Sequence, residues 1–302
     1  MLLSSGGFAV YLTESKVFDQ VFPQFGNLGE ARNRRKVLAL WLKSKLFALS
    51  GLDRELIANK ILAECRHGGD FLRIVMEEIA RKQRVVRWAD NTPEHVLYLP
   101  TILKELPGVR VIHMIRDGRD VAVSLEKKGW VRPFPWDRDC RSLVAGLYWE
   151  WMVEKGRACK KMNGHGYMEI RYEELTSRPA ETLEKIGNFI EHDLDYQRIQ
   201  QVGIGSVNEP NTSFESEIES SSFQPVGRWR SALAAEQIAA LEALIGPTLR
   251  DLGYPLSAPN GSSSHVPRRM RRVYHSFWDA KLWLKTKTPL GRVFAKTSAK
   301  EL

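Results

Sequence analysis

The sequence predicts an α/β protein in which a parallel sheet is flanked by helices. Three observations support this fold class. Short apolar runs alternate with helical patterns along most of the chain. The run over 109–116 ends in a glycine-containing turn that opens a helix, and the run over 167–172 is also followed by a helix. Helices between two strands supply the long crossover connections that parallel pairing needs.

The individual elements follow from apolar spacing and from capping residues. Thr92 and Pro93 form an N-cap followed by proline at the first helical position, and Asp137 is a candidate cap for a long helix. Short apolar runs predict strands over 85–88, 109–116 and 167–172. Helical spacing and turn signals predict helices over 30–49, 53–65, 70–83, 93–105, 119–128, 137–162, 179–191 and 234–251.

Composition divides the chain into three parts. We expect a main domain over 1–256, a linker rich in Ser, Pro, Gly and Asn over 257–264, and a basic amphipathic tail over 265–302. The tail contains ten Lys or Arg residues against Asp279 and Glu301, so it carries most of the net charge of +9. A nucleic-acid-binding surface on the main domain is therefore not indicated.

The tail also contains several aromatic residues, among them Tyr274, Phe277, Trp278 and Trp283. This mixture of aromatic and basic residues suits peripheral contact with an anionic membrane surface or with an acidic partner. The alternative is a basic helix that packs on its own domain.

Cysteine usage and hydropathy indicate a cytoplasmic protein. Cys65, Cys140 and Cys159 are far apart and form no CxxC pair, as expected for reduced thiols. The sequence has no run of 18 apolar residues and no basic segment followed by an apolar core at its start. No group of residues has metal-ligand spacing, so no metal is expected.

The most informative stretch is Val109–Ser124, VRVIHMIRDGRDVAVS. Arg116 follows a buried strand, a glycine-containing turn comes next, and Ser124 lies near the start of the following helix. A helix N-terminus attracts anions, and an arginine binds phosphate oxygens bidentately. The stretch therefore predicts a phosphate site. As a lone residue, Arg116 could instead form an ion pair with Asp117 or Asp120.

Three further segments follow in order, Tyr172-Glu173-Glu174-Leu175, Thr212-Ser213-Phe214 and Gly227-Arg228-Trp229-Arg230. Together with Arg116 and Ser124, they resemble the bacterial-type sulfotransferases that use 3′-phosphoadenosine 5′-phosphosulfate (PAPS), and are closer to the tyrosylprotein-like branch. The resemblance covers residues 8–256 and implies a sulfotransferase fold similar to that of P-loop NTPases, without its N-terminal part.

The resemblance implies PAPS as the donor, adenosine 3′,5′-bisphosphate (PAP) as the product, and no metal. The family's Arg-Lys-Gly form of the C-terminal turn is not reproduced in this chain. By resemblance, Arg116 and Ser124 bind the 3′-phosphate, Tyr172, Thr212 and Phe214 surround adenine, and Arg228 and Trp229 belong to the donor-binding turn.

The reaction implied by the resemblance is transfer of a sulfuryl group to a hydroxyl or an amine. The acceptor attacks sulfur in line, and a general base accepts its proton. In the tyrosylprotein-like branch this base is a glutamate, and the matching segment here contains Glu14. The alternative for Glu14 is a solvated side chain in a loop. The acceptor, whether small molecule, glycan, lipid or peptide, is not specified by the sequence.

Two departures from the family are evident. No segment has the form Pro-Lys/Arg-Ser-Gly-Thr-Thr, the loop that holds the 5′-phosphosulfate, and Asn91 stands where relatives often carry lysine. Either the chain begins at a downstream methionine of a working enzyme, or it is a truncated paralogue that binds nucleotide without chemistry. A membrane-associated adaptor is a non-enzymatic alternative. A P-loop kinase is disfavoured because no Gly-x4-Gly-Lys-Ser/Thr is present.

Overall fold

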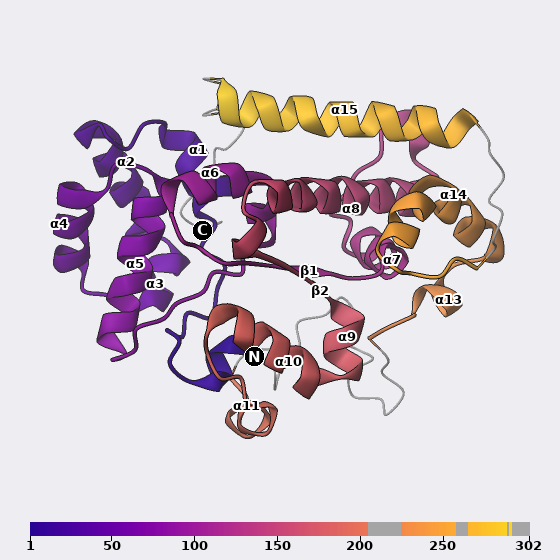
Figure 1. Cartoon of the computed structure of the whole chain (residues 1–302). Helices are drawn as coiled ribbons and strands as arrows, with labels where there is room; N and C mark the ends of the chain where they lie inside the picture. The colour runs from indigo at the N-terminus through magenta and orange to yellow at the C-terminus, as the bar shows by residue number, and fades with distance from the viewer. Residues whose placement is uncertain (205–224, 258–264, 289, 292–302) are drawn as a thin grey trace.

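A computed structural model describes residues 1–204, 225–257, 265–288 and 290–291. At its centre lie two parallel strands, β1 (Val111–Ile115) and β2 (Tyr167–Arg171), which pair in the register Val111 with Tyr167 through Ile115 with Arg171 (Figure 1). Two helices, α7 (Gly118–Lys128) and α8 (Arg141–Ala158), connect them. This crossover confirms the predicted α/β fold class with parallel pairing.

The expected strand over 85–88 is reduced to a single parallel bridge between Phe8 and Arg87. The Ala9 N–H donates to the Arg87 carbonyl at 2.7 Å, and the Arg87 N–H donates to the Gly7 carbonyl at 3.3 Å. Val86 points into solvent and is 91% exposed. Two backbone hydrogen bonds and one packed side stabilise a bridge but not a longer strand.

The N-terminal helices form a group of their own on the left of Figure 1. The predicted helix over 30–49 is divided in two, because the Ser44 hydroxyl accepts the Phe47 N–H and starts a new helix. The predicted helix over 93–105 begins as a 3₁₀ segment. The elements are η2 (Val17–Val21), α1 (Phe22–Phe25), α2 (Ala31–Trp41), α3 (Lys45–Ser50), α4 (Arg54–Glu64), α5 (Gly68–Lys82), η3 (Pro93–Tyr98) and α6 (Leu99–Glu105). The first segment, η1 (Leu2–Ser5), lies apart from this group and packs against the helix over 196–202.

Two further groups of helices cover the sheet. Below it in Figure 1 lie α9 (Tyr172–Ser177), α10 (Pro179–Ile190) and α11 (Tyr196–Val202). Above and beside it, a hydrophobic core joins α7 and α8 to three C-terminal helices. These are α13 (Trp229–Ala232), α14 (Ala235–Asp251) and α15 (His265–Lys287), and short 3₁₀ segments lie at η4 (Pro135–Asp137), η5 (Cys159–Lys161) and η6 (Gly164–Gly166).

The tail helix α15 packs along α8 (Figure 1). Tyr274 and Trp278 are buried, Asp279 pairs with Lys155 at 2.7 Å, and the Trp151 indole N–H donates to Asp279 at 2.8 Å. The structure therefore shows the second of the two alternatives for the tail, a basic helix that packs on its own domain.

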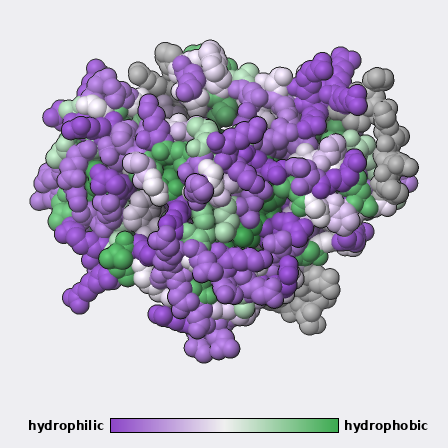
Figure 2. Space-filling view, viewed as in Figure 1, coloured by the Kyte–Doolittle hydropathy of each residue, from purple (hydrophilic) through white to green (hydrophobic). Residues whose placement is uncertain are grey.

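Hydrophilic residues cover most of the face shown in Figure 2, with small hydrophobic areas between them. Among the helices of the described ranges, none has both the length and the apolar character needed to cross a bilayer.

Candidate active site

The candidate site is built at the end of β1, where the chain turns sharply into α7. The Asp117 carboxylate accepts the Arg119 N–H at 2.9 Å and caps the helix. Gly118 lies against the Trp149 ring, where an added Cβ would be only 2.5 Å from the nearest ring atom. The Trp149 indole N–H donates to the Arg116 carbonyl at 3.0 Å. The close approach of this ring explains why glycine occupies the first helical position.

The Arg116 side chain is partly buried among groups from three segments. Its guanidinium lies over the Tyr172 ring, 5.1 Å from the centroid, and its Nη2 donates to the Pro225 carbonyl. The Asp120 carboxylate is 3.9 Å from the same nitrogen. The Arg116 Nε is buried without a hydrogen-bond partner, although 27% of the side chain is exposed. The exposed part of the side chain gives the charged group access to solvent, as anion binding by a guanidinium requires.

The turn over 225–229 is held by Asp120, a residue that the sequence did not single out as functional. Its side chain is fully buried, and its two oxygens accept the Gly227 N–H at 2.7 Å and the Trp229 N–H at 3.0 Å. Asp120 lies in the first turn of α7, where the helix dipole stabilises a carboxylate. Arg116 and the predicted donor-binding turn are therefore fixed by the same side chain.

Arg119 is the ion-pair partner of Asp117, the other acidic residue of the turn. Its guanidinium binds both oxygens of Asp117, at 3.0 and 2.7 Å, and contacts Glu242 at 2.5 Å. It also lies 3.9 Å from the centroid of the Trp229 ring. Burial lowers the pKa of Arg119, but Asp117 and Glu242 outweigh this effect and raise the pKa. Asp117 is thus the partner of Arg119, which leaves Asp120 as the acidic neighbour of Arg116.

The segment that begins at Tyr172 is tied to the same turn through Glu173. Its carboxylate accepts the Asp117 N–H at 2.8 Å and the Tyr254 hydroxyl at 2.8 Å. These bonds hold Tyr172 beside Arg116. Ser124 is on α7, one helical turn after Asp120 and therefore on the same side of the helix.

Thr212 and Phe214, the other residues expected near adenine, lie outside the described residues. Arg228 and Trp229 lie in the turn that Asp120 holds, with Trp229 buried. The structure thus brings together Arg116, Tyr172 and the turn.

Comparison with known proteins identifies the family of the chain. A model described as the sulfotransferase family matches residues 14–196. The chain belongs to the sulfotransferase family. This assignment confirms the resemblance inferred from the sequence.

Individual relatives are distant from this sulfotransferase. A Caenorhabditis elegans protein, named provisionally as a protein-tyrosine sulfotransferase, is 27% identical over 217 residues, which cover 69% of this chain and 77% of that protein. Mouse sulfotransferase 1B1 is 27% identical over 100 residues, covering 31% of this chain and 33% of the mouse protein.

Two solved structures are similar to this sulfotransferase. The sulfotransferase domain from the curacin biosynthetic pathway aligns with a TM-score of 0.49 and 15% identity, over 84% of this chain and 92% of that one. Mouse sulfotransferase SULT7A1, solved in complex with PAP, aligns with a TM-score of 0.39 and 19% identity, over 67% and 75%.

Glu14, the expected base of the sulfotransferase, lies in a different environment from Arg116. It is partly buried, and burial followed by the carboxylate of Glu94 raises its pKa. The next residue, Ser15, donates its N–H to Asp90 at 3.2 Å. None of the charged groups that shift this pKa belongs to the candidate site around Arg116, so the structure does not bring Glu14 and Arg116 together.

The segment before η3 is held by a buried histidine. The Asp90 carboxylate contacts His95 Nδ1 at 2.6 Å, while His95 Nε2 accepts the Phe18 N–H at 3.2 Å. Thr92 is the N-cap residue of η3 and Pro93 its first residue, as predicted, but the Thr92 hydroxyl donates to Asp90 at 3.1 Å and makes no capping bond. Burial raises the pKa of Asp90, but the bonds from His95, Ser15 and Thr92 lower it further than burial raises it.

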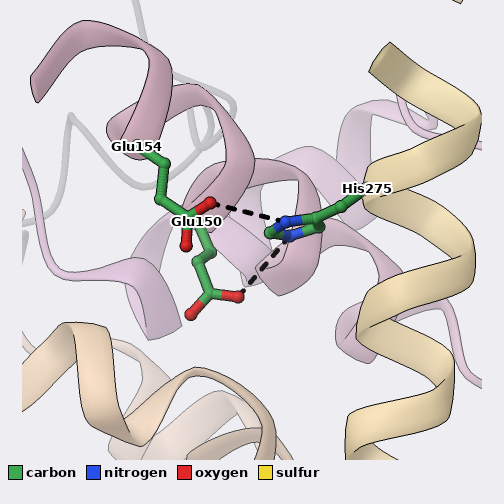
Figure 3. Close-up of side chains that lie close together, drawn as sticks. All are labelled: Glu150, Glu154 and His275. Carbon is green, nitrogen blue, oxygen red and sulfur yellow. Dashed lines mark ion pairs between the residues drawn. The ribbon is translucent and has the colours of Figure 1, made fainter. Parts of the chain in front are cut away.

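Within the described ranges, one cluster has the residue types of a metal site. Glu150 and Glu154 on α8 face His275 on α15, with each carboxylate 3.5 Å from one ring nitrogen (Figure 3). Arg271 already pairs with both, at 2.8 Å from Glu150 and 2.7 Å from Glu154. The arginine supplies the positive charge that a cation would bring, so these residues fit an ion-pair cluster that holds α15 against α8.

Proposed function

We propose that this sulfotransferase transfers a sulfuryl group from PAPS to a hydroxyl or an amine of an acceptor. The observation that carries the proposal is the position of Arg116 at the carboxyl end of β1. Ligands of open α/β sheets bind at this edge. The buried Arg116 Nε has no hydrogen-bond partner, while the guanidinium lies between the Tyr172 ring and the turn over 225–229.

In this proposal the donor is recognised by its adenosine 3′-phosphate. Arg116 and Ser124 bind the phosphate oxygens, and the Tyr172 ring offers a flat apolar surface to adenine. Thr212 and Phe214 complete the adenine contacts, and Arg228 and Trp229 close the site from the turn. Support comes from the contacts of Asp120, which keep the turn next to Arg116.

The chemistry exchanges one bond to sulfur for another. The acceptor oxygen or nitrogen forms a bond to sulfur, and the bond between sulfur and the phosphate oxygen of the nucleotide breaks, so that PAP leaves. The acceptor proton passes to a base, and we assign this role to Glu14. Its raised pKa supports the assignment, because a base works best when its pKa lies near the working pH.

A second candidate function is nucleotide binding without transfer. It is favoured by Asn91, which stands in place of the family's lysine and carries no positive charge. Under this alternative, Arg116 would still bind PAP, while no group would stabilise charge on the transferring sulfuryl group.

Two measurements separate these functions. Calorimetric titration with PAP tests the donor site, and a screen with radiolabelled PAPS over small-molecule, glycan, lipid and peptide acceptors tests transfer. Binding together with transfer supports the enzyme, and binding without transfer supports the second function. Absence of PAP binding would overturn both. We place this reaction in the cytoplasm, in keeping with three cysteines that form no disulfide.

A further inference from the structure

The loop between α7 and α8 carries an arginine-lined cavity. Arg132, Arg138 and Arg141 surround it together with Glu126 and prolines of the loop, and its volume is about 500 Å³. All three arginines are exposed. Glu126 is the one acidic residue in the lining. Three guanidinium groups against one carboxylate make this cavity electropositive and suited to a phosphorylated ligand.

The same loop carries exposed aromatic side chains. Trp130 and Trp136 are each 74% exposed. The Trp136 ring stacks on Phe134 with 4.9 Å between centroids, and Phe134 in turn contacts Phe277 of α15 at 5.0 Å. Large exposed aromatic rings are uncommon on the surface of a monomer and mark contact sites.

The outer side of α15 continues this surface. On this side Val273 and Phe277, one helical turn apart, are 43% and 44% exposed. Arg269 and Arg272 are exposed beside them. The helix therefore presents two exposed apolar side chains and an arginine, four residues apart in turn, next to the side that packs on α8.

The cavity is separate from the candidate donor site. Arg116 lies at the N-terminal end of α7, whereas the cavity begins at Glu126 and Gly129, near its C-terminal end. Eleven residues of α-helix span about 16 Å. A ligand in the cavity is therefore not the 3′-phosphate that Arg116 is proposed to bind.

We propose that the loop over 129–141 and the outer side of α15 form a docking surface for an anionic phospholipid membrane. The arginine cavity binds a phosphorylated lipid headgroup. Trp130, Trp136 and Phe277 enter the headgroup region, where tryptophan side chains are favoured because they combine an apolar body with a polar N–H. The combination of a basic cavity with open aromatic rings favours a lipid surface over a purely acidic protein partner, which would leave the rings unburied.

The test is co-sedimentation of the full chain with vesicles of phosphatidylcholine, with and without phosphatidylserine. We expect binding only to the vesicles that contain phosphatidylserine, and weaker binding at high salt. The triple variant Arg132→Gln, Arg138→Gln, Arg141→Gln should lower the partition coefficient roughly a hundredfold. The matched control Arg32→Gln, Arg35→Gln, Lys36→Gln removes the same charge from the exposed face of α2 and should bind like the parent chain.

The aromatic part of the surface is tested by Trp136→Ala combined with Phe277→Ala, which should weaken binding to the same vesicles while the melting temperature is retained. Equal binding to both kinds of vesicle, or a triple variant that binds like the parent, would overturn the proposal. So would binding of inorganic phosphate or a polyglutamate peptide through these arginines without vesicle binding. None of these measurements uses PAPS, so their failure is distinct from failure of the proposed sulfuryl transfer.

Discussion

At the scale of single residues, Asp120 has the largest effect on the geometry of the candidate donor site. Both of its oxygens are used, and an asparagine would present an N–H₂ group to one of the two backbone N–H donors. We expect Asp120→Asn to lower the free energy of unfolding by about 1.5–3 kcal/mol, the value of hydrogen bonds to a charged group, and to weaken PAP binding. Denaturant unfolding and calorimetry measure the two effects.

The control for this variant is Asp139→Asn, which removes the same charge from an exposed position. It should change neither stability nor PAP affinity. Unchanged PAP affinity in Asp120→Asn would show that the turn over 225–229 does not take part in donor binding.

Glu14 gives a prediction about pH dependence. A base must be ionised to act, so kcat should rise with pH through the raised pKa of Glu14. Glu14→Gln should remove this rise and lower kcat by about two to four orders of magnitude. Glu94→Gln removes a carboxylate that raises this pKa, so it should move the rise to lower pH. An unaltered pH profile in Glu14→Gln would assign the base to another residue.

His113 gives a prediction about acid stability. Burial lowers its pKa to about 4, with Glu169 opposing the shift, and its Nδ1 lies 2.6 Å from the Tyr167 hydroxyl. The unfolded chain, with a histidine pKa of about 6.5, binds the proton first as the pH falls. Stability from this group is therefore full above pH 6.5 and is lost as the pH falls toward 4.

Between pH 7 and pH 5 this loss is about 2 kcal/mol. Denaturant unfolding at both pH values should show that His113→Gln loses less stability than the parent chain by that amount. An equal loss in the two proteins would mean that His113 is not held neutral by the fold.

At the scale of elements, the contact between α7 and α8 positions the candidate site. A methyl group at Gly118 would meet the Trp149 ring, a rigid neighbour, at 2.5 Å. Gly118→Ala should therefore destabilise the protein by about 1–3 kcal/mol and weaken PAP binding, because it displaces the start of α7. Gly164→Ala is the matched control, since nothing lies within 4 Å of its added Cβ. Equal melting temperatures for the two variants would contradict this account of the turn.

Elements with a clear period were predictable from the sequence, and those set by local bonding were not. The strand 109–116 and the helix after it appear as β1 and α7, because the apolar run and the glycine-containing turn are both visible in the sequence. The division of 30–49 depends on one bond from Ser44 to Phe47, which apolar spacing does not record. The run over 85–88 is apolar but lacks a packed partner on both sides, so it stays a bridge.

At the scale of the whole molecule, the candidate site joins segments more than 100 residues apart. Arg116 and Tyr172 were predictable because both follow strands, and parallel strands end at one edge of a sheet. The bonds from Asp120 to the turn over 225–229 were not predicted, because this turn comes 107 residues later in the chain. Its spacing of four from Arg116 on the way into α7 was the available signal. Glu14 was chosen by resemblance alone, and its surroundings are formed by Asp90 and Glu94.

The packing of the tail was also only partly predictable from the sequence. Composition indicated a basic amphipathic segment, but it does not say which of the aromatic residues pack against the domain. The structure places Tyr274 and Trp278 against α8 and leaves Phe277 and Trp283 exposed. Arg271 also forms ion pairs with α8 on this side, and so does His275, whose pairs are drawn in Figure 3.

The central claim, that this sulfotransferase binds an adenosine 3′-phosphate through Arg116, is tested most directly by calorimetric titration of the full chain with PAP and with adenosine 5′-monophosphate, which lacks the 3′-phosphate. We predict that PAP binds at least about tenfold more tightly, a difference of about 1.4 kcal/mol, and that Arg116→Ala removes this preference without lowering the melting temperature. Equal affinities for the two nucleotides, or a preference for PAP that survives in Arg116→Ala, would contradict it.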